Sequence, residues 1–406
     1  MRRSRTGTSR APAALMLAFA LLVPGSGPRG PGTSPGPVPV STSFAQLDAA
    51  IASGIRRGVY PGAVVIVGRR GAILHARGFG RLSWTGGSRA PNPDSTIYDL
   101  ASLTKVIATT SAAMVLVDRG LIDLEAPVSR YLSRFNRATQ RSITVRMLLD
   151  HTSGLKPYSE FYKRSSTRDG IVALLLREEP VREPGKAAVY SDLNAMLLGL
   201  VIEDVAGEPL DRFTRREVFE PLEMSETGFK PAPSRQRRAA PSYADRHLTL
   251  AGVVHDRNSR DMGGVAGHAG LFSTAADLAR FAQWWLQEGQ AGERHIVSAE
   301  TMHGFLEHGS ASGTRLLGWD SPDPDVEGGS VFGRMLSRSA YGHTGWTGTQ
   351  LWVDPEKDLF VILLTNRSLN PRVARSLRDL RLVRAQVADA AVIGANSACQ
   401  DQRSTC

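Results

Sequence analysis

Cysteine is almost absent from this chain of 406 residues. Its two cysteines, Cys399 and Cys406, both lie among the last eight residues. The rest of the chain therefore has no thiol for a disulfide framework, a cysteine nucleophile or a multi-cysteine zinc or iron–sulfur site. We predict that Cys399 and Cys406 can close a small loop in an oxidising compartment and have no catalytic role.

Lysine is also scarce, although the chain is basic. Only six of the 49 Lys and Arg residues are lysine, and with 39 Asp and Glu the net charge is +10. A lysine close to a possible nucleophile is therefore informative. The composition is otherwise that of a folded protein, with 42% hydrophobic and 22% charged residues, which excludes wholesale disorder.

Acidic residues are missing from the first 40 positions, where five arginines supply half of the net charge. An apolar run over 11–23 follows and is too short for a membrane span of about 20 residues. We interpret 1–23 as a signal peptide, or alternatively an uncleaved anchor, and 24–43 as a Pro/Gly-rich linker. The mature chain is then expected to be periplasmic or secreted, with no membrane span. No cysteine follows the run, which excludes a lipoprotein anchor.

The remaining positive charge is spread over arginine-rich stretches such as 235–246 and 367–384. Neither stretch has interleaved aromatics or a nucleic-acid-binding motif. We predict that the second contains a helix with a solvated arginine face, preceded by Arg367, and we expect no nucleic-acid partner. A surface-binding or nucleic-acid-binding protein remains an alternative that rests on charge alone.

Hydrophobic periodicity predicts strands at both ends of the folded part and helices between them. The predicted strands cover 63–68, 73–80, 350–353 and 359–365, and the predicted helices cover 44–51, 102–119, 143–150, 171–177, 193–205 and 371–391. This order favours an α/β (α+β) domain over 44–394, with a helical lobe at about 101–260 and a flexible tail at 395–406. The terminal strands are expected to form one antiparallel sheet, and the cleft between sheet and lobe is the natural site.

Two Ser-x-x-Lys pairs differ in their local structure. Residues three apart on a helix share a face, so Lys105 can reach the hydroxyl of Ser102 at the start of a long apolar helix. A serine needs such a basic partner to become a nucleophile, and burial is expected to depress the pKa of Lys105. The second pair, Ser153 and Lys156, encloses a glycine and precedes a proline, so we predict a turn without catalytic function. The alternative role for Ser102 is a helix N-cap.

Tyr190 precedes a helix that starts near residue 193. A tyrosine held beside a lysine can act as a general base. Ser191 or Asp192 can cap the helix, and the alternative interpretation is a core tyrosine with a capping aspartate.

The segment from His343 through Thr344 and Gly345 to Trp346 leads into the C-terminal strands. Glycine there lets a substrate approach the strand edge. A backbone N–H of this segment can join the N–H of Ser102 in an oxyanion hole.

Other polar and aromatic candidates are interpreted as structural. We predict that His151 fixes a turn through its side chain. The set of His255, Asp256 and His268 fits no compact metal-ligand spacing, so we predict that it fixes loops, with a metal site as the alternative. The pair 284–285, Trp-Trp, is expected to pack a helix on the core.

The three motifs together resemble the serine β-lactamase and penicillin-binding-protein superfamily, most of all its class C branch. That branch includes D-alanyl-D-alanine carboxypeptidases, D-aminopeptidases and esterases. The resemblance covers about 44–391 and includes the stretches 61–65, 148–155, 267–275 and 348–355. It implies a β-lactamase/DD-peptidase-like fold, with helices flanking the antiparallel sheet.

The resemblance also implies an acyl-enzyme mechanism without metal or organic cofactor. Ser102 would be the nucleophile, and Lys105 with Tyr190 would move its proton to the leaving group. The N–H groups of Ser102 and Trp346 would bind the oxyanion. The substrate-binding residues would be Asp192, His343, Thr344 and Gly345.

Two positions depart from the family pattern. Asp192 stands where the family usually has Asn, which would repel a carboxylate and change the pattern of acceptors. His343 stands where β-lactamases usually have Lys, and a neutral imidazole binds a carboxylate less firmly. Both changes lower the expected β-lactamase activity.

We therefore expect an exported serine hydrolase that acts on a small-molecule or peptide substrate. The first candidate substrates are peptidoglycan stem peptides that end in D-alanine, and small esters and β-lactams are the next candidates. The alternatives are a carboxylesterase of the same family and a weakly catalytic module that binds β-lactams or muropeptides.

Overall fold

The computed structural model describes residues 42–243, 249–309, 311–323, 330–370 and 373–401. The predicted export signal, almost all of the predicted linker, and Cys406 lie outside the described residues. Among the described residues, no helix is both long and apolar enough to cross a membrane.

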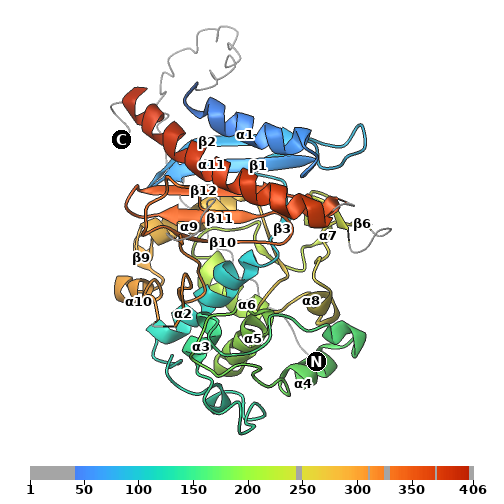
Figure 1. The fold of residues 1–406 in the computed structure, drawn as a ribbon, viewed down its shortest axis with the longest axis vertical. Helices are drawn as coiled ribbons and strands as arrows, with labels where there is room; N and C mark the ends of the chain where they lie inside the picture. Colours follow the sequence, from blue (N-terminus) through green and yellow to red (C-terminus); the bar gives the residue numbers. More distant parts are fainter. Residues whose placement is uncertain (1–41, 244–248, 310, 324–329, 371–372, 402–406) are drawn as a thin grey trace, which may run out of the picture. The chain divides into compact units, whose positions relative to one another are not determined.

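An antiparallel five-stranded sheet joins the two ends of the described chain, as predicted (Figure 1). In spatial order its strands are β10 (Tyr341–Thr344), β11 (Gln350–Asp354), β12 (Leu359–Thr365), β1 (Gly62–Arg69) and β2 (Ala72–Gly80). The register pairs Val65 of β1 with Leu363 of β12. β10 is therefore the last strand on this side of the sheet, and on its outer side Gly342 exchanges two backbone hydrogen bonds with Asp320, each at 2.9 Å.

Helices cover both faces of this sheet. α1 (Ala45–Arg56) and α11 (Val373–Asp401) lie on one face, and α9 (Ala275–Leu286) packs on the other (Figure 1). Successive side chains of a strand point to opposite faces, so Val64 packs in the cluster with α9, whereas Val65 packs in the cluster with α1 and α11. Both faces being covered explains the almost continuous apolar run of β1.

The helical lobe lies between β2 and α9 in the sequence. It consists of short helices: α2 (Ser111–Asp118), α3 (Val145–Leu149), α4 (Arg168–Leu175), α5 (Asp192–Ala206), α6 (Leu210–Thr214), α7 (Pro233–Gln236) and α8 (Arg257–Asp261). The predicted helix at 102–119 is present but begins with a π-helical segment at Lys105–Thr110, with α2 following.

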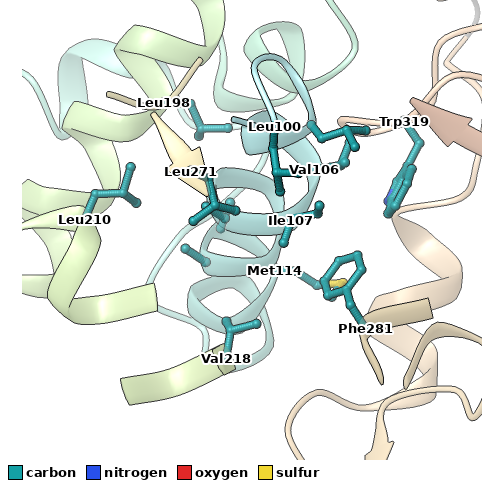
Figure 2. Close-up of a cluster of buried hydrophobic side chains, with 14 of the residues drawn as sticks. Leu100, Val106, Ile107, Met114, Leu198, Leu210, Val218, Leu271, Phe281 and Trp319 are labelled. Atoms are coloured by element: carbon teal, nitrogen blue, oxygen red, sulfur yellow. The ribbon is translucent and has the colours of Figure 1, made fainter. Parts of the chain in front are cut away.

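The π-helical segment and α2 lie at the centre of the main core. Figure 2 shows Leu198 and Leu210 of the lobe on one side of this segment and Phe281 and Trp319 on the other. Burial of such side chains contributes about 1.5–3 kcal/mol each. The helical segment that begins with Lys105, just after the candidate nucleophile, is therefore held from both the lobe and the α9 side of the molecule.

A small three-stranded sheet joins parts of the lobe to the chain just before α9. It contains β3 (Tyr98–Asp99), β7 (Leu271–Ser273) and β4 (Gly228–Phe229). The remaining short elements are β5 (Ser242–Tyr243), β6 (Thr249–Leu250), β8 (Gln290–Ala291), β9 (Arg294–His295), α10 (Ala299–Gly304), a second π-helical segment (Arg215–Phe219) and 3-10 turns at Thr42–Phe44, Val128–Arg130, Phe161–Lys163 and Arg367–Leu369.

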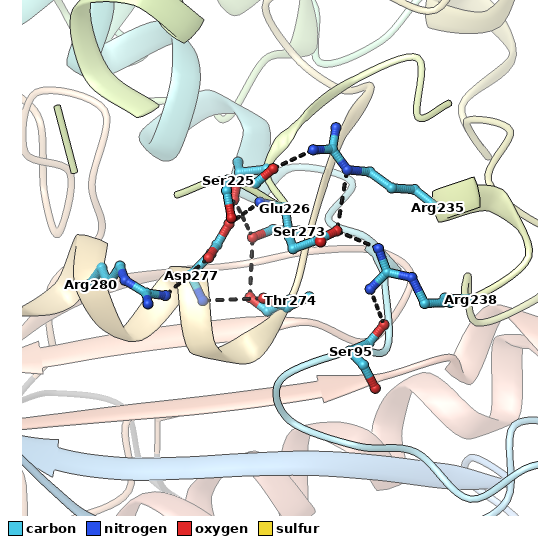
Figure 3. Close-up of polar contacts among 10 residues, drawn as sticks. Ser95, Ser225, Glu226, Arg235, Arg238, Ser273, Thr274, Asp277 and Arg280 are labelled. Carbon is cyan, nitrogen blue, oxygen red and sulfur yellow. Dashed lines mark hydrogen bonds and ion pairs between the residues drawn. The ribbon is translucent and has the colours of Figure 1, made fainter. Parts of the chain in front are cut away.

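Asp277 fixes the start of α9 through a polar network (Figure 3). Its carboxylate accepts the N–H of Glu226 and the hydroxyl of Thr227, each at 2.8 Å, and its own N–H donates to Thr274 Oγ1 at 3.2 Å. Arg238 extends the network from Glu226 to the backbone of Ser95. Trp284 and Trp285 of α9 are buried in the core, as predicted.

The C-terminal helix is longer than predicted. α11 continues to Asp401, ten residues beyond the predicted end at 391, and Ala395 is 1% exposed. The expectation of a flexible tail from 395 is therefore wrong up to residue 401. Cys399 lies within α11.

Candidate active site

Ser102 lies in the turn between β3 and the π-helical segment. The chain is held there by Leu100, whose N–H donates to Leu271 O at 2.9 Å. Ala101 adopts a left-handed conformation with φ 47°. This turn presents Ser102, which is partly exposed, to a pocket.

Lys105 is one turn further and 3% exposed. Its Nζ donates to Ser102 Oγ at 3.0 Å and to His268 O at 3.1 Å, and pairs with Asp192 Oδ1 at 2.7 Å. The Ser102 hydroxyl is therefore bound by a lysine, as the helical spacing predicted.

The protonation state of Lys105 differs from the prediction. Burial by itself lowers the pKa of Lys105, but the Asp192 carboxylate and Tyr190 outweigh it, so the pKa is raised above its ordinary value. Lys105 is consequently an ammonium at neutral pH. The expectation of a depressed lysine pKa is wrong because it omitted Asp192.

Tyr190 lies against Lys105, whose Nζ is 4.9 Å from the ring centroid. The ring also packs on two imidazoles, with centroid distances of 4.8 Å to His151 and 5.7 Å to His343. His151 Nδ1 accepts the backbone N–H of Ser191 at 3.3 Å, as expected for a residue that fixes this turn.

Neither candidate cap of α5 acts as one. Ser191 stands at the N-cap position, but its hydroxyl donates to Lys156 O at 2.7 Å, and no side-chain cap bond forms. The Asp192 carboxylate pairs with Lys105 instead. The capping interpretation of Ser191 and Asp192 is therefore wrong.

β10 and the turn after it form the opposite wall. His343 and Thr344 end the strand, and Gly345 begins the turn. A Cβ on Gly345 would lie 2.4 Å from Leu100 O and 2.1 Å from Thr349 Oγ1, so only glycine permits this approach to the Ser102 turn. Glycine is therefore required here to bring this turn close to the Ser102 turn.

His343 is a neutral imidazole in this site. Burial, and then the charges of Arg315 and Lys105, hold its pKa well below the ordinary value. Its Nδ1 lies 2.9 Å from Thr344 O, and because a carbonyl only accepts, Nδ1 carries the proton. His343 therefore presents an acceptor nitrogen, not a cation.

Two buried arginines hold the turn between β10 and β11. Arg384 of α11 donates to Gly345 O at 3.0 Å and Thr349 O at 2.8 Å. Arg367 donates to Trp346 O at 3.1 Å and lies 4.7 Å from the Trp346 ring centroid. The predicted solvated arginine face is therefore wrong for Arg384, although Arg378 and Arg381 of α11 are exposed.

A pocket of about 300 Å³ opens between these walls. Its lining includes most of the candidate site residues: Ser102, Tyr190, His343, Thr344, Gly345 and Trp346. Trp346 is 49% exposed. Among the described residues, neither the N–H of Ser102 nor that of Trp346 makes a hydrogen bond. Both amides are thus available to a bound group.

Arg315 is a pocket residue that the sequence did not reveal. Its guanidinium carbon lies 5.0 Å from the Tyr190 ring centroid, and it pairs with Asp320 at 3.4 Å. Arg315 lies in an irregular loop outside every motif, so no local signal identifies it.

The rejected candidates are structural. Ser153 is buried and donates to Asn194 Oδ1 at 2.6 Å, whereas Lys156 pairs with Glu178, so this Ser-x-x-Lys pair does not assemble. His268 Nε2 lies 2.8 Å from Asp256 Oδ1, which supports the loop-fixing interpretation.

Comparison with known sequences identifies the family. The Beta-lactamase family profile matches residues 47–386. A Bacillus subtilis (strain 168) protein named N-acetylmuramyl-L-alanine amidase is 34% identical over 347 residues, covering 77% of this chain and 78% of that protein. An Escherichia coli O157:H7 protein provisionally named D-alanyl-D-alanine carboxypeptidase is 31% identical over 364 residues, covering 80% and 82%.

Solved structures share the fold. EstCE1, a hydrolase with promiscuous acyltransferase activity, is 25% identical with a TM-score of 0.66, covering 83% of this chain and 98% of that chain. A class C β-lactamase from Rhodobacter sphaeroides is 23% identical with a TM-score of 0.65, covering 82% and 98%. With the family profile spanning most of its length, the chain belongs to the beta-lactamase family of serine hydrolases.

Proposed function

We propose that this chain hydrolyses an amide bond of cell-wall stem peptides through an acyl-enzyme on Ser102. The observation that carries the proposal is the contact of Ser102 Oγ with Lys105 Nζ beside Tyr190, in a pocket open to substrate. Ser102 attacks the carbonyl carbon, the leaving amine departs with a proton, and water then releases the acyl group.

Tyr190 is the base in this proposal. Lys105 is an ammonium that donates to Ser102, so it has no lone pair to accept the serine proton. Tyr190 takes that proton and passes it to the leaving amine, and the Lys105 ammonium lies 4.9 Å from the ring centroid of Tyr190.

The oxyanion is bound by the N–H groups of Ser102 and Trp346. Both are backbone donors, and Arg367, Arg384 and Gly345 fix the turn that carries the second one. Donors fixed before reaction cost no reorganisation in the transition state.

The substrate that fits best carries a carboxylate next to the cleaved bond. His343 is neutral, but Arg315, which pairs with Asp320 at 3.4 Å, brings a cation to the same pocket as Thr344. A guanidinium is well suited to a carboxylate. We therefore place the reaction with the D-alanyl-D-alanine carboxypeptidases, after export to the periplasm or exterior.

Trp346 favours a second candidate for the bond that is cleaved. This residue is 49% exposed and lines the same pocket as Ser102, and the guanidinium carbon of Arg367 lies 4.7 Å from its ring centroid. Such an apolar ring face can pack on the C–H face of a sugar, which suits the bond between N-acetylmuramic acid and L-alanine named for the Bacillus subtilis relative.

One substrate, an N-acetylmuramyl pentapeptide ending in D-alanyl-D-alanine, offers both bonds. Mass spectrometry of the products is expected to show release of D-alanine. Release of the intact peptide from the sugar would instead support the second candidate. Turnover only of short-chain esters or nitrocefin, or a stable penicillin adduct on a protein that cleaves neither bond of this peptide, would contradict both.

The carboxylate contact is tested with Arg315→Gln. We expect the KM for the free-acid peptide to rise at least tenfold, with a smaller change for the C-terminal amide. Arg338→Gln, which changes an exposed arginine outside the pocket, is the matched control. Equal effects of Arg315→Gln on acid and amide would exclude this role.

A further inference from the structure

Asp99 is a buried carboxylate three residues before Ser102, at the end of β3. It is 6% exposed, and its two oxygens bind backbone groups. Oδ1 accepts the N–H of Ala101 at 2.9 Å, and Oδ2 accepts the N–H of His255 at 2.6 Å. The side chain therefore ties the Ser102 turn to the loop before α8.

The hydrogen bond from the Ala101 N–H to Asp99 is made by a residue in a strained conformation. Ala101 has φ 47°, a left-handed conformation that costs a residue with a Cβ about 1–2 kcal/mol. A carboxylate that accepts the N–H two residues ahead makes an Asx-turn, which compensates this cost locally. The strain sits immediately before the nucleophile, where it sets the direction of the Ser102 N–H and side chain.

The hydrogen bond of Asp99 to His255 connects Asp99 to a second contact of Lys105. His255 is followed by Asp256, which binds His268 Nε2 at 2.8 Å, and the backbone O of His268 accepts Lys105 Nζ at 3.1 Å. The backbone O of Asp99 also accepts Thr347 Oγ1 at 2.7 Å, in the turn after β10. Asp99 thus contacts the Ser102 turn, the loop before α8 and the turn after β10.

We propose that Asp99 is a positioning residue that holds Ala101 in its left-handed conformation, and so aims the Ser102 hydroxyl and N–H at the substrate carbonyl. The proposal rests on the proposed role of Ser102 as nucleophile. Asp99 touches neither substrate nor the reacting atoms, and acts through backbone geometry alone.

The charge of Asp99 matters to this geometry. An ionised carboxylate accepts two N–H bonds, whereas a protonated one must turn an O–H toward one of the two donors. Burial raises the pKa of Asp99 to about 6, and Asp256 adds to the rise while Arg260 and the two N–H bonds oppose it. Acylation is therefore expected to weaken as Asp99 is protonated.

The test measures the rate at which a fluorophosphonate acylates the full chain, per folded molecule, from pH 5 to 8. Asp99→Asn is expected to lower this rate at pH 7.5 at least tenfold and to remove the inflection near pH 6. Asp277→Asn is the matched control, because Asp277 is also buried and holds backbone N–H far from Ser102 in sequence. The control is expected to stay within twofold of the wild type.

Ala101→Gly provides a rescue, because glycine adopts positive φ without strain. Combined with Asp99→Asn, it is expected to restore most of the lost rate. An unchanged rate and pH profile in Asp99→Asn, or no recovery in the double variant, would overturn the proposal.

Amide hydrogen exchange separates this proposal from the function itself. Asp99→Asn is expected to speed exchange in the peptide covering residues 99–105, and unchanged exchange would count against the positioning role. If the wild type took no label on Ser102, the nucleophile assignment would fail, while the exchange result would still decide the role of Asp99.

Discussion

Asp192 sets the charge of the lysine that binds the candidate nucleophile. Its carboxylate lies 2.7 Å from Lys105 Nζ and contributes to the raised lysine pKa. An Asn at this position would leave the ammonium without a counter-charge in a buried place. The departure from the family pattern thus has a physical consequence for proton transfer.

The first prediction concerns the alkaline side of the pH profile. Asp192→Asn removes the carboxylate, and burial then lowers the pKa of Lys105. The alkaline limb of the Ser102 acylation rate is expected to move to lower pH by at least one unit. The measurement is the acylation rate from pH 7 to 11.

Glu178→Gln is the control for this change. It breaks the Lys156–Glu178 pair, which lies outside the pocket lining, and is expected to leave the limb in place. If the alkaline limb of the acylation rate stayed in place in Asp192→Asn, the pKa of Lys105 would not depend on this carboxylate.

At this scale the sequence predicted the residues that belong to short motifs. Ser102 and Lys105 meet because helix spacing is a local property, whereas the place of Tyr190 beside them was predicted from the family resemblance. Arg315 was missed because it lies in an irregular loop, and the ion pair of Asp192 with Lys105 was missed because the two residues are 87 positions apart in the sequence.

Among the elements, α11 does more than cover the sheet. Arg384 reaches from it to Gly345 O and Thr349 O, which close the turn carrying the Trp346 N–H. A helix remote in sequence from Ser102 therefore holds one half of the proposed oxyanion site.

The second prediction tests this contact. Arg384→Lys keeps the charge but loses the planar fork that binds two carbonyls, so the acylation rate is expected to fall about tenfold. Arg381→Lys, an exposed change on the same helix, is expected to have no effect. Equal rates for the two variants would contradict the role of Arg384.

The strands and most helices were predictable because their apolar patterns are local. The end of α11 was not, since Gly394 and the polar residues after it are poor helix formers. Tertiary contact overrides that preference: a Cβ on Gly394 would lie 2.4 Å from the Phe44 ring, so glycine lets α11 pack closely there.

For the whole molecule, Asp99 links the site to stability. Its pKa of about 6 is above the ordinary 3.8, so its contribution to stability is full below pH 3.8 and is lost as pH rises through 6. The ionised carboxylate that orders the Ser102 turn thus lowers the stability of the fold at neutral pH.

The third prediction follows from this sign. As pH falls from 7.5 to 5.0, the free energy of unfolding of the wild type is expected to rise by about 1 kcal/mol relative to Asp99→Asn. Denaturant unfolding of both proteins at several pH values measures it. A constant difference, or one of opposite sign, would show that Asp99 does not titrate as stated.

The account depends most on Ser102 as the nucleophile. Intact-mass measurement after treatment with a fluorophosphonate tests it directly, with Ser102→Ala and Ser153→Ala as the two serines of the Ser-x-x-Lys pairs. The predicted result is one adduct on the wild type and on Ser153→Ala, and none on Ser102→Ala. An unlabelled wild type, or an adduct that persists in Ser102→Ala, would contradict the account.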